Sequence, residues 1–332
     1  MRQVTAWLFL GAVGFLLVGA PPWLWYAVCA AAVFGLMLLI DAFLFDGDVY
    51  VSEWEPTVVS GLLQLAPWLV VPWFVDIRWT DASVLAVIAG VLNMSSLVFY
   101  FRAMRNEQDA VAIAVMWNTL IATVSLAAVF LLGEDISFVQ KAGIGLILLG
   151  AMIGTWRPTA IRFAVVGLMS AAVVLSSLYA VSEKVAFNLL ERSGMSDADA
   201  FWNVFLCFTL GEGLVALVAA VVIWRRREGR HLGSLVNRFW WVFLPIEGSY
   251  LAFTGLTARA YSLGPASLVA PIDGLAGPFV VVLSMLAAHL FRRTRYAMPT
   301  REVGAKQEEQ FWWKAIGIAV IISGAFLVGG DG

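Results

Sequence analysis

The chain has 332 residues, of which 61% are hydrophobic and only 13% are charged. A soluble domain carries about 25% charged residues, so this composition excludes an ordinary soluble fold and indicates an integral membrane protein. The net charge of −2 also argues against nucleic acid as a partner.

The apolar residues come in stretches of roughly 20, the length that a helix needs to cross about 30 Å of hydrocarbon. They do not alternate in short runs, as the strands of a membrane barrel would. We therefore predict an all-α integral membrane protein with these apolar segments in chain order: 4–20, 24–45, 56–76, 82–101, 110–132, 138–155, 163–187, 201–224, 239–261, 266–290 and 311–329.

The first segment has two interpretations. Residues 1–22 read as an extra N-terminal transmembrane helix, or as a signal-like segment, because Met1–Ala20 combines a base, an apolar core and a small residue at its end. Pro21 directly after the cleavage position and the single base near the start favour a retained helix.

Two later blocks repeat one pattern and begin 157 positions apart, at residues 100 and 257. Each has an Arg-Ala pair, an apolar segment of more than 20 residues, a break, and a last helix with two glycines, Gly143/Gly150 and Gly317/Gly324. Small residues at this spacing let helices approach closely, so we assign the glycines to packing. Repeated halves are typical of transporters. We place the repeats at 23–157 and 158–332.

Lys and Arg gather in alternate breaks, those that follow residues 101, 155, 224 and 290. Cytoplasmic loops carry an excess of these bases, so this set of breaks is predicted to be cytoplasmic. The expected location is the inner (cytoplasmic) membrane, crossed many times.

The two blocks resemble the EamA-type transporters of the drug/metabolite transporter superfamily. The resemblance rests on Tyr100–Met104, Gly133-Glu134 and the paired glycines, and on Arg259–Tyr261 with Pro271 and Pro278. It implies ten helices in two inverted five-helix repeats, with a cavity lined mainly by the first, third and fourth helices of each. It also implies ATP-independent movement of small organic solutes. This chain departs by its extra first helix, by a C-terminus predicted outside, and by Ala114 at the position that matches Pro271.

We select four acids inside apolar segments: Asp41, Glu212, Glu247 and Asp273. A charge at the bilayer centre costs about 2.5–3.5 kcal/mol on insertion scales, so each is a functional candidate. Asp273 and Glu247 lie beside Pro and Gly, where a loosened backbone could open carbonyl groups to a cavity. We expect these two to bind a cationic solute or a proton. The alternative is a neutral or hydrogen-bonded structural carboxyl, which we favour for Glu212, whereas Asp41 lies close to a helix end and is expected to reach the membrane interface.

Uncharged groups complete the predicted substrate site. Asn118 and Asn93 lie mid-segment, Trp117 could stack on a solute, and Tyr179 lies on the first helix of the second repeat. Each could instead join neighbouring helices by hydrogen bonds. Arg259 is expected to bind an acidic solute group or to pair with Glu247.

The sequence thus predicts a secondary transporter of a small polar metabolite that works by alternating access. A flippase of a lipid-linked substrate and a non-transporting protein that keeps the fold stay open. No enzyme, cofactor or metal site is expected, because the two histidines and two cysteines show no catalytic or ligand spacing. The expected partners are a small-molecule solute and membrane lipid. Both a monomer and a homodimer fit.

Overall fold

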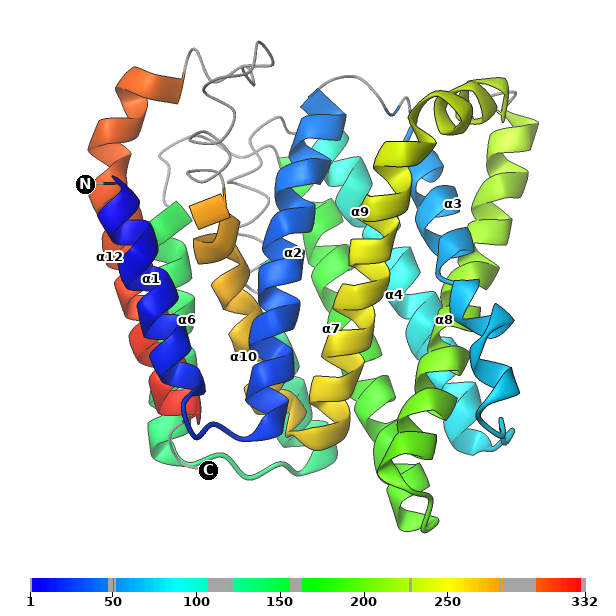
Figure 1. The fold of residues 1–332 in the computed structure, drawn as a ribbon, viewed down its shortest axis with the longest axis horizontal. Coiled ribbons are helices and arrows are strands. Elements are labelled where there is room, and N and C mark those ends of the chain that lie inside the picture. Colours follow the sequence, from blue (N-terminus) through cyan, green and yellow to red (C-terminus); the bar gives the residue numbers. More distant parts are fainter. Residues whose placement is uncertain are drawn as a thin grey trace.

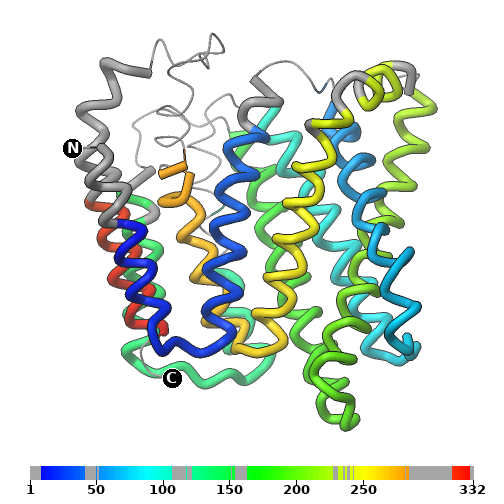
Figure 2. The backbone as a smooth tube through the Cα atoms, viewed as in Figure 1, coloured from blue at the N-terminus to red at the C-terminus, as the bar shows by residue number. Residues whose placement is uncertain are grey.

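The protein is a bundle of long helices in this computed structural model, which describes residues 2–46, 50, 52–106, 117, 122–155, 163–226, 229–280, 282–283 and 303–329. No strand occurs in these ranges. Figures 1 and 2 show the long helices running side by side between an upper and a lower end. The α-helices are α1 (Arg2–Leu17), α2 (Pro22–Asp46), α3 (Trp54–Leu63), α4 (Asp81–Asn106), α6 (Phe138–Thr155), α7 (Phe163–Arg192), α8 (Asp197–Arg225), α9 (Gly229–Leu263), α10 (Ala266–Ile272) and α12 (Val303–Gly329).

Short helices that are not α-helical occur at four places in the described part of the chain. Three are 3₁₀ helices, η1 (Ala66–Leu69), η2 (Val71–Trp73) and η4 (Asp273–Leu275), and the fourth, η3 (Ala128–Leu132), is a π-helical turn.

Within the described residues, five segments are long and apolar enough to cross a membrane: Pro22–Asp41, Trp54–Trp73, Asp81–Asn106, Phe163–Arg192 and Asp197–Arg225. Large apolar side chains also point outward from the bundle, as Val218 (62% exposed) and Phe163 (91% exposed) do. A contiguous apolar exterior of this kind is stable in lipid and not in water. The predicted class, a helical membrane protein, is confirmed at this level.

Two segments differ from their predictions. The segment 56–76 is not one helix, because α3 ends at Leu63 and the 3₁₀ helices η1 and η2 follow. Pro67 and Pro72 lie at the starts of these turns, and proline has no N–H for an α-helical bond. The expected interruption near Glu247 is also wrong, since α9 continues through Pro245.

Helices distant in sequence form the main packing pairs: α4 with α7, α2 with α9, α6 with α12, and α3 with α8. The α6–α12 pair meets at the repeated glycines. A Cβ at Gly143 would lie 2.7 Å from the carbonyl oxygen of Gly324, and one at Gly150 would lie 2.6 Å from that of Gly317. The predicted packing role of these glycines is therefore confirmed, and the two helices run antiparallel.

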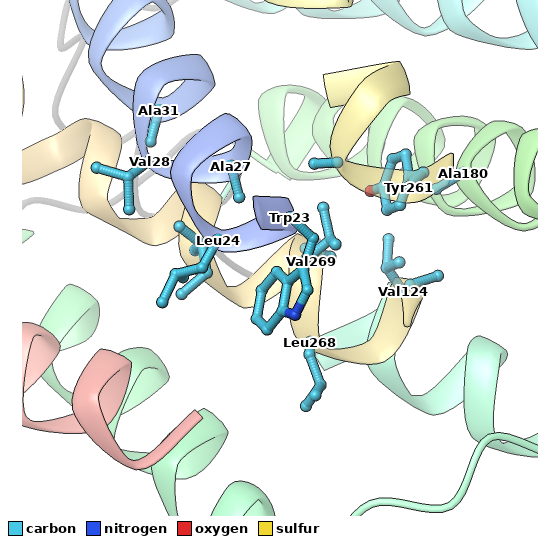
Figure 3. Close-up of a cluster of buried hydrophobic side chains, with 14 of the residues drawn as sticks. Trp23, Leu24, Ala27, Val28, Ala31, Val124, Ala180, Tyr261, Leu268 and Val269 are labelled. Carbon is cyan, nitrogen blue, oxygen red and sulfur yellow. The ribbon is translucent and has the colours of Figure 1, made fainter. Parts of the chain in front are cut away.

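The lower end of the bundle is filled by apolar side chains around the start of α2 (Figure 3). Trp23 and Leu24 pack with Tyr261, at the end of α9, and with Leu268 and Val269, at the start of α10. Tyr261 is only 1% exposed. We call these five residues the lower seal, because all five are buried in one apolar cluster at this end.

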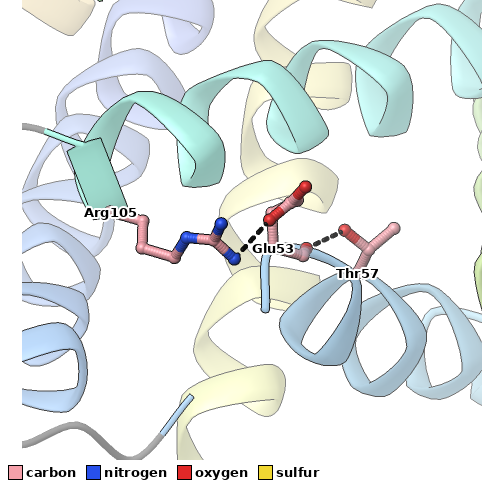
Figure 4. A network of polar contacts seen from close by, with 3 residues as sticks. All are labelled: Glu53, Thr57 and Arg105. Carbon is pink, nitrogen blue, oxygen red and sulfur yellow. Dashed lines mark hydrogen bonds and ion pairs between the residues drawn. The ribbon is translucent and has the colours of Figure 1, made fainter. Parts of the chain in front are cut away.

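At the upper end, the start of α3 is tied to three other helices. The Arg105 guanidinium of α4 lies 2.7 Å from the Glu53 carboxylate, while the Thr57 hydroxyl donates to the Glu53 backbone carbonyl (Figure 4). His231 Nδ1 of α9 lies 2.7 Å from Glu55 Oε1. Arg226, directly after α8, stands 6.0 Å above the ring of Trp54.

Candidate functional site

A buried cavity of about 40 Å³ lies between the helices, farther along α2 than the lower seal. One water needs about 10–15 Å³ on this measure, so the cavity holds about three water-sized groups in this conformation. Its described walls come from α2, α3, α4, α7, α9, η4 and Trp117: Phe34, Met37, Asp41, Tyr50, Pro56, Ser60, Asn93, Leu97, Tyr100, Phe101, Trp117, Tyr179, Ile246, Glu247, Tyr250, Phe253 and Asp273.

Three carboxyl groups from three different elements line this cavity: Asp41 of α2, Glu247 of α9 and Asp273 of η4. Glu247 is 4% exposed, and its Oε2 has no hydrogen-bond partner among the described residues. The Ser60 hydroxyl of α3 interacts with the same carboxyl group. A buried carboxyl oxygen without a donor is unfavourable, so Glu247 leaves an open position for a ligand atom or a proton.

Asp273 reaches the cavity because the helix changes character at this residue. The α-helix α10 ends at Ile272, and the 3₁₀ turn η4 takes over at Asp273. Pro271 inside α10 removes one backbone donor, which weakens the regular helical bonding just before the turn. The loosened backbone predicted around Asp273 is therefore present.

Aromatic rings form much of the remaining wall. The rings of Phe34 and Phe253 stack at 4.9 Å, and Trp117 lies 6.0 Å from Phe34 and 5.3 Å from Tyr100. The Tyr100 hydroxyl is buried and has no partner in the described part of the chain. Burial raises the pKa of Tyr50, in the loop before α3, well above its usual value, so this phenol stays neutral.

A second polar group lies directly behind this wall. Asn93 Nδ2 donates to Glu212 Oε1 at 2.8 Å, and the Tyr250 hydroxyl donates to the same oxygen at 2.7 Å. Asn93 Nδ2 also lies 3.0 Å from the Tyr250 oxygen. The three side chains join α4, α8 and α9, as predicted for a structural carboxyl at Glu212. Because Asn93 and Tyr250 also line the cavity, a ligand that moves them moves the partners of Glu212.

Most of the predicted site residues come together here. Asp273, Glu247, Trp117, Asn93 and Tyr179 all line the cavity, and Asn118 lies outside the described residues.

Arg259 is elsewhere, so its expected pairing with Glu247 is not found. Its guanidinium lies 5.5 Å from the centre of the Phe201 ring and 3.4 Å from the Ser262 hydroxyl, near the lower end of α9. Twelve residues of continuous helix separate Arg259 from Glu247, a distance of about 18 Å along the axis.

Sequence reasoning did not select Tyr100, Tyr250 or Glu183. Tyr100 opens the first repeated block, and Tyr250 follows Asn93 by 157 residues, the spacing of the blocks. The repeat could therefore have identified both tyrosines. Glu183 is 2% exposed on α7, one helical turn beyond Tyr179. Its place inside the predicted apolar segment 163–187 could have identified it.

A larger hollow, of about 420 Å³, lies at the lower end between the loop before α4 and the loop before α8. Its charged residues, Asp76, Arg78 and Asp199, are exposed to solvent. Water and salt screen such charges. The enclosed cavity is the better candidate site.

Comparison with known proteins supports the fold alone. A solved structure described as "Crystal structure of protein" matches with a TM-score of 0.59 at 18% identity, over 91% of this chain and 97% of that chain. No family model and no curated protein matches this sequence.

Proposed function

We propose that this chain is a secondary transporter of a small polar metabolite, of the EamA type within the drug/metabolite transporter superfamily. The observation that carries the proposal is the buried cavity, whose polar walls come from both predicted repeats. Most of its lining, from α2, α4, α7, α9, η4 and Trp117, matches the helices that the resemblance assigns to the substrate cavity, while Tyr50, Pro56 and Ser60 come from α3 and the loop before it.

The packing of the helices supports two inverted repeats. With α2 to α6 as the first repeat and α7 to α12 as the second, the α4–α7 pair corresponds to the α2–α9 pair. Asn93 and Tyr250 are equivalent by the spacing of 157 and contact each other, as residues beside a two-fold axis would. The glycine contacts between α6 and α12 also join equivalent helices, the last helix of each proposed repeat.

Alternating access would expose the cavity first at one end and then at the other. The lower seal is buried at one end of the bundle in this conformation, so the proposed transport cycle requires its side chains to move. The upper end carries Arg105 and Arg226 and the other arginines near the ends of α4 and α8. By the distribution of bases this end faces the cytoplasm. The proposed orientation places the start of α1 inside and the end of α12 outside.

The test is counterflow in proteoliposomes with a panel of radiolabelled amines, amino acids, nucleosides and sugars. Wild-type protein is expected to exchange at least one of them, and Asp273→Asn and Glu247→Gln are expected to abolish the exchange while leaving yield and thermal stability intact. The matched control is Glu191→Gln, an exposed acid at the end of α7. Exchange at the wild-type rate in both cavity variants would remove carboxylate chemistry from the mechanism.

A further inference from the structure

We infer that the cavity recognises a small organic cation whose nitrogen carries hydrogens, a primary or secondary alkylammonium ion, through Glu247, Tyr100 and the surrounding aromatic rings. This inference rests on the proposed transport function and names the substrate class of the same site.

The first argument is the charge of the walls. Asp41, Glu247 and Asp273 line the cavity, and none of its described lining residues is Lys, Arg or His. Buried charge needs a compensating charge, so an anionic solute would meet repulsion here without a basic group to offset it. A cation meets three possible counterions.

The second argument is the hydrogen-bonding capacity left open. Glu247 Oε2 and the Tyr100 hydroxyl are both buried, and neither has a partner among the described residues. The side chains are 4% and 3% exposed, so bulk water does not satisfy them. An ionised carboxylate only accepts hydrogen bonds, and a phenol oxygen accepts as well. A primary ammonium supplies two or more N–H donors, whereas a quaternary ammonium supplies none. The unpaired acceptors therefore select against quaternary ions.

The third argument is the aromatic wall. Phe34, Trp117, Phe253 and Tyr100 surround the acids, with ring centroids 4.9 to 6.0 Å apart. Aromatic faces carry negative electrostatic potential and attract cations, most strongly where water is excluded. The same rings offer an apolar surface to the carbon chain of the ligand. A strongly hydrated metal ion would gain little from such a wall.

The size of the cavity limits the choice of test ligand. The cavity of about 40 Å³ has room for an ammonium head with about two carbons, so a longer chain enters only if side chains of the wall move. We choose n-butylammonium as the test ligand, because its four carbons also reach the apolar rings of the wall, with three compounds of similar size that each lack one feature. 1-Butanol lacks the charge, butyrate reverses it, and tetramethylammonium keeps the charge without N–H groups.

Thermal unfolding of the purified full-length protein is followed in detergent with each compound at the same concentration and neutral pH. A ligand that binds only the folded state raises the unfolding temperature. The expected result is a rise with n-butylammonium and none with the other three. Glu247→Gln and Tyr100→Phe are each expected to weaken n-butylammonium binding about tenfold or more, the loss of one charge-assisted hydrogen bond. Glu191→Gln is expected to bind like the wild type.

Equal stabilisation by butyrate or 1-butanol would overturn the inference, and equal stabilisation by tetramethylammonium would overturn its N–H requirement. If the Glu247→Gln variant does not fold, the Tyr100→Phe variant still tests the inference, since it removes only a hydroxyl group. Counterflow separates this inference from the proposed function. Exchange of a neutral or anionic metabolite by protein that does not bind n-butylammonium would refute the substrate class alone. Binding of n-butylammonium with no exchange of any solute would refute transport alone.

Discussion

Replacing Gly150 by alanine should push α6 and α12 apart. The new Cβ would lie 2.6 Å from the Gly317 carbonyl oxygen and 2.7 Å from the Ile321 backbone nitrogen, whereas ordinary contact begins at 3.4 Å. Both obstacles are backbone atoms, so no side-chain rotation relieves them. The helices must separate by roughly 0.8 Å here, and overpacking of this kind costs about 1–3 kcal/mol.

Gly145→Ala is the matched control on the same helix. No described atom lies within 4 Å of the Cβ position at Gly145, and the residue is exposed. Both substitutions gain the same helix propensity, about 1 kcal/mol, so the difference between the two variants isolates the packing penalty. We expect Gly150→Ala to be less stable than Gly145→Ala by about 1–3 kcal/mol. Reversible unfolding in detergent measures it, and equal stability of the two variants would refute the close crossing of α6 and α12.

Other contacts yield three more predictions. Glu134 accepts from Ala266 N at 2.9 Å, Ser267 N at 2.8 Å and the Ser267 hydroxyl at 2.6 Å, so Glu134→Ala should cost about 1–2 kcal/mol in unfolding free energy by uncapping α10. An unchanged unfolding midpoint would contradict this capping role. A double-mutant cycle on Arg105 and Glu53, with glutamine at each, should give a coupling energy of only about 0.5–1 kcal/mol, because the Arg105 side chain is 43% exposed. A coupling energy near zero would show that the 2.7 Å pair does not stabilise the fold. Glu212→Gln should fold like the wild type, because the amide oxygen can keep both hydrogen bonds, while Glu212→Ala should lose about 2–4 kcal/mol; equal melting temperatures for these two variants would argue against the network.

The sequence predicted those features of the fold that depend on composition or repetition over many residues. Apolar length predicted the membrane helices, and the spacing of Gly143/Gly150 and Gly317/Gly324 predicted a close crossing. Hydropathy failed after Leu63, because prolines in an apolar run change the backbone without changing the hydrophobicity. The proline and glycine beside Glu247 also led to an expected interruption, although a transmembrane helix tolerates one missing bond when its neighbours continue the pattern.

Side-chain direction limited the prediction of the site. Acids in apolar segments were selected by the cost of burying charge, which identified Asp273 and Glu247 without knowledge of the fold, whereas Asp41, expected at the membrane interface, also lines the cavity. The expected pairing of Glu247 with Arg259 is not found, because twelve residues at about 100° each place the two side chains roughly 120° apart around α9. Partners such as Tyr250 depend on which helices pack together, and periodicity alone does not contain that information.

The crossing of α6 and α12 limits how the two halves can move. Ile147 lies against Gly324 and Ile321 against Gly150, so each glycine receives a branched side chain from the opposite helix at two heights along the crossing. Sliding one helix by a turn would drive these side chains into backbone. The pair therefore resists sliding. In the proposed transport cycle, α6 and α12 are expected to move together as one unit while the helices around the cavity rearrange.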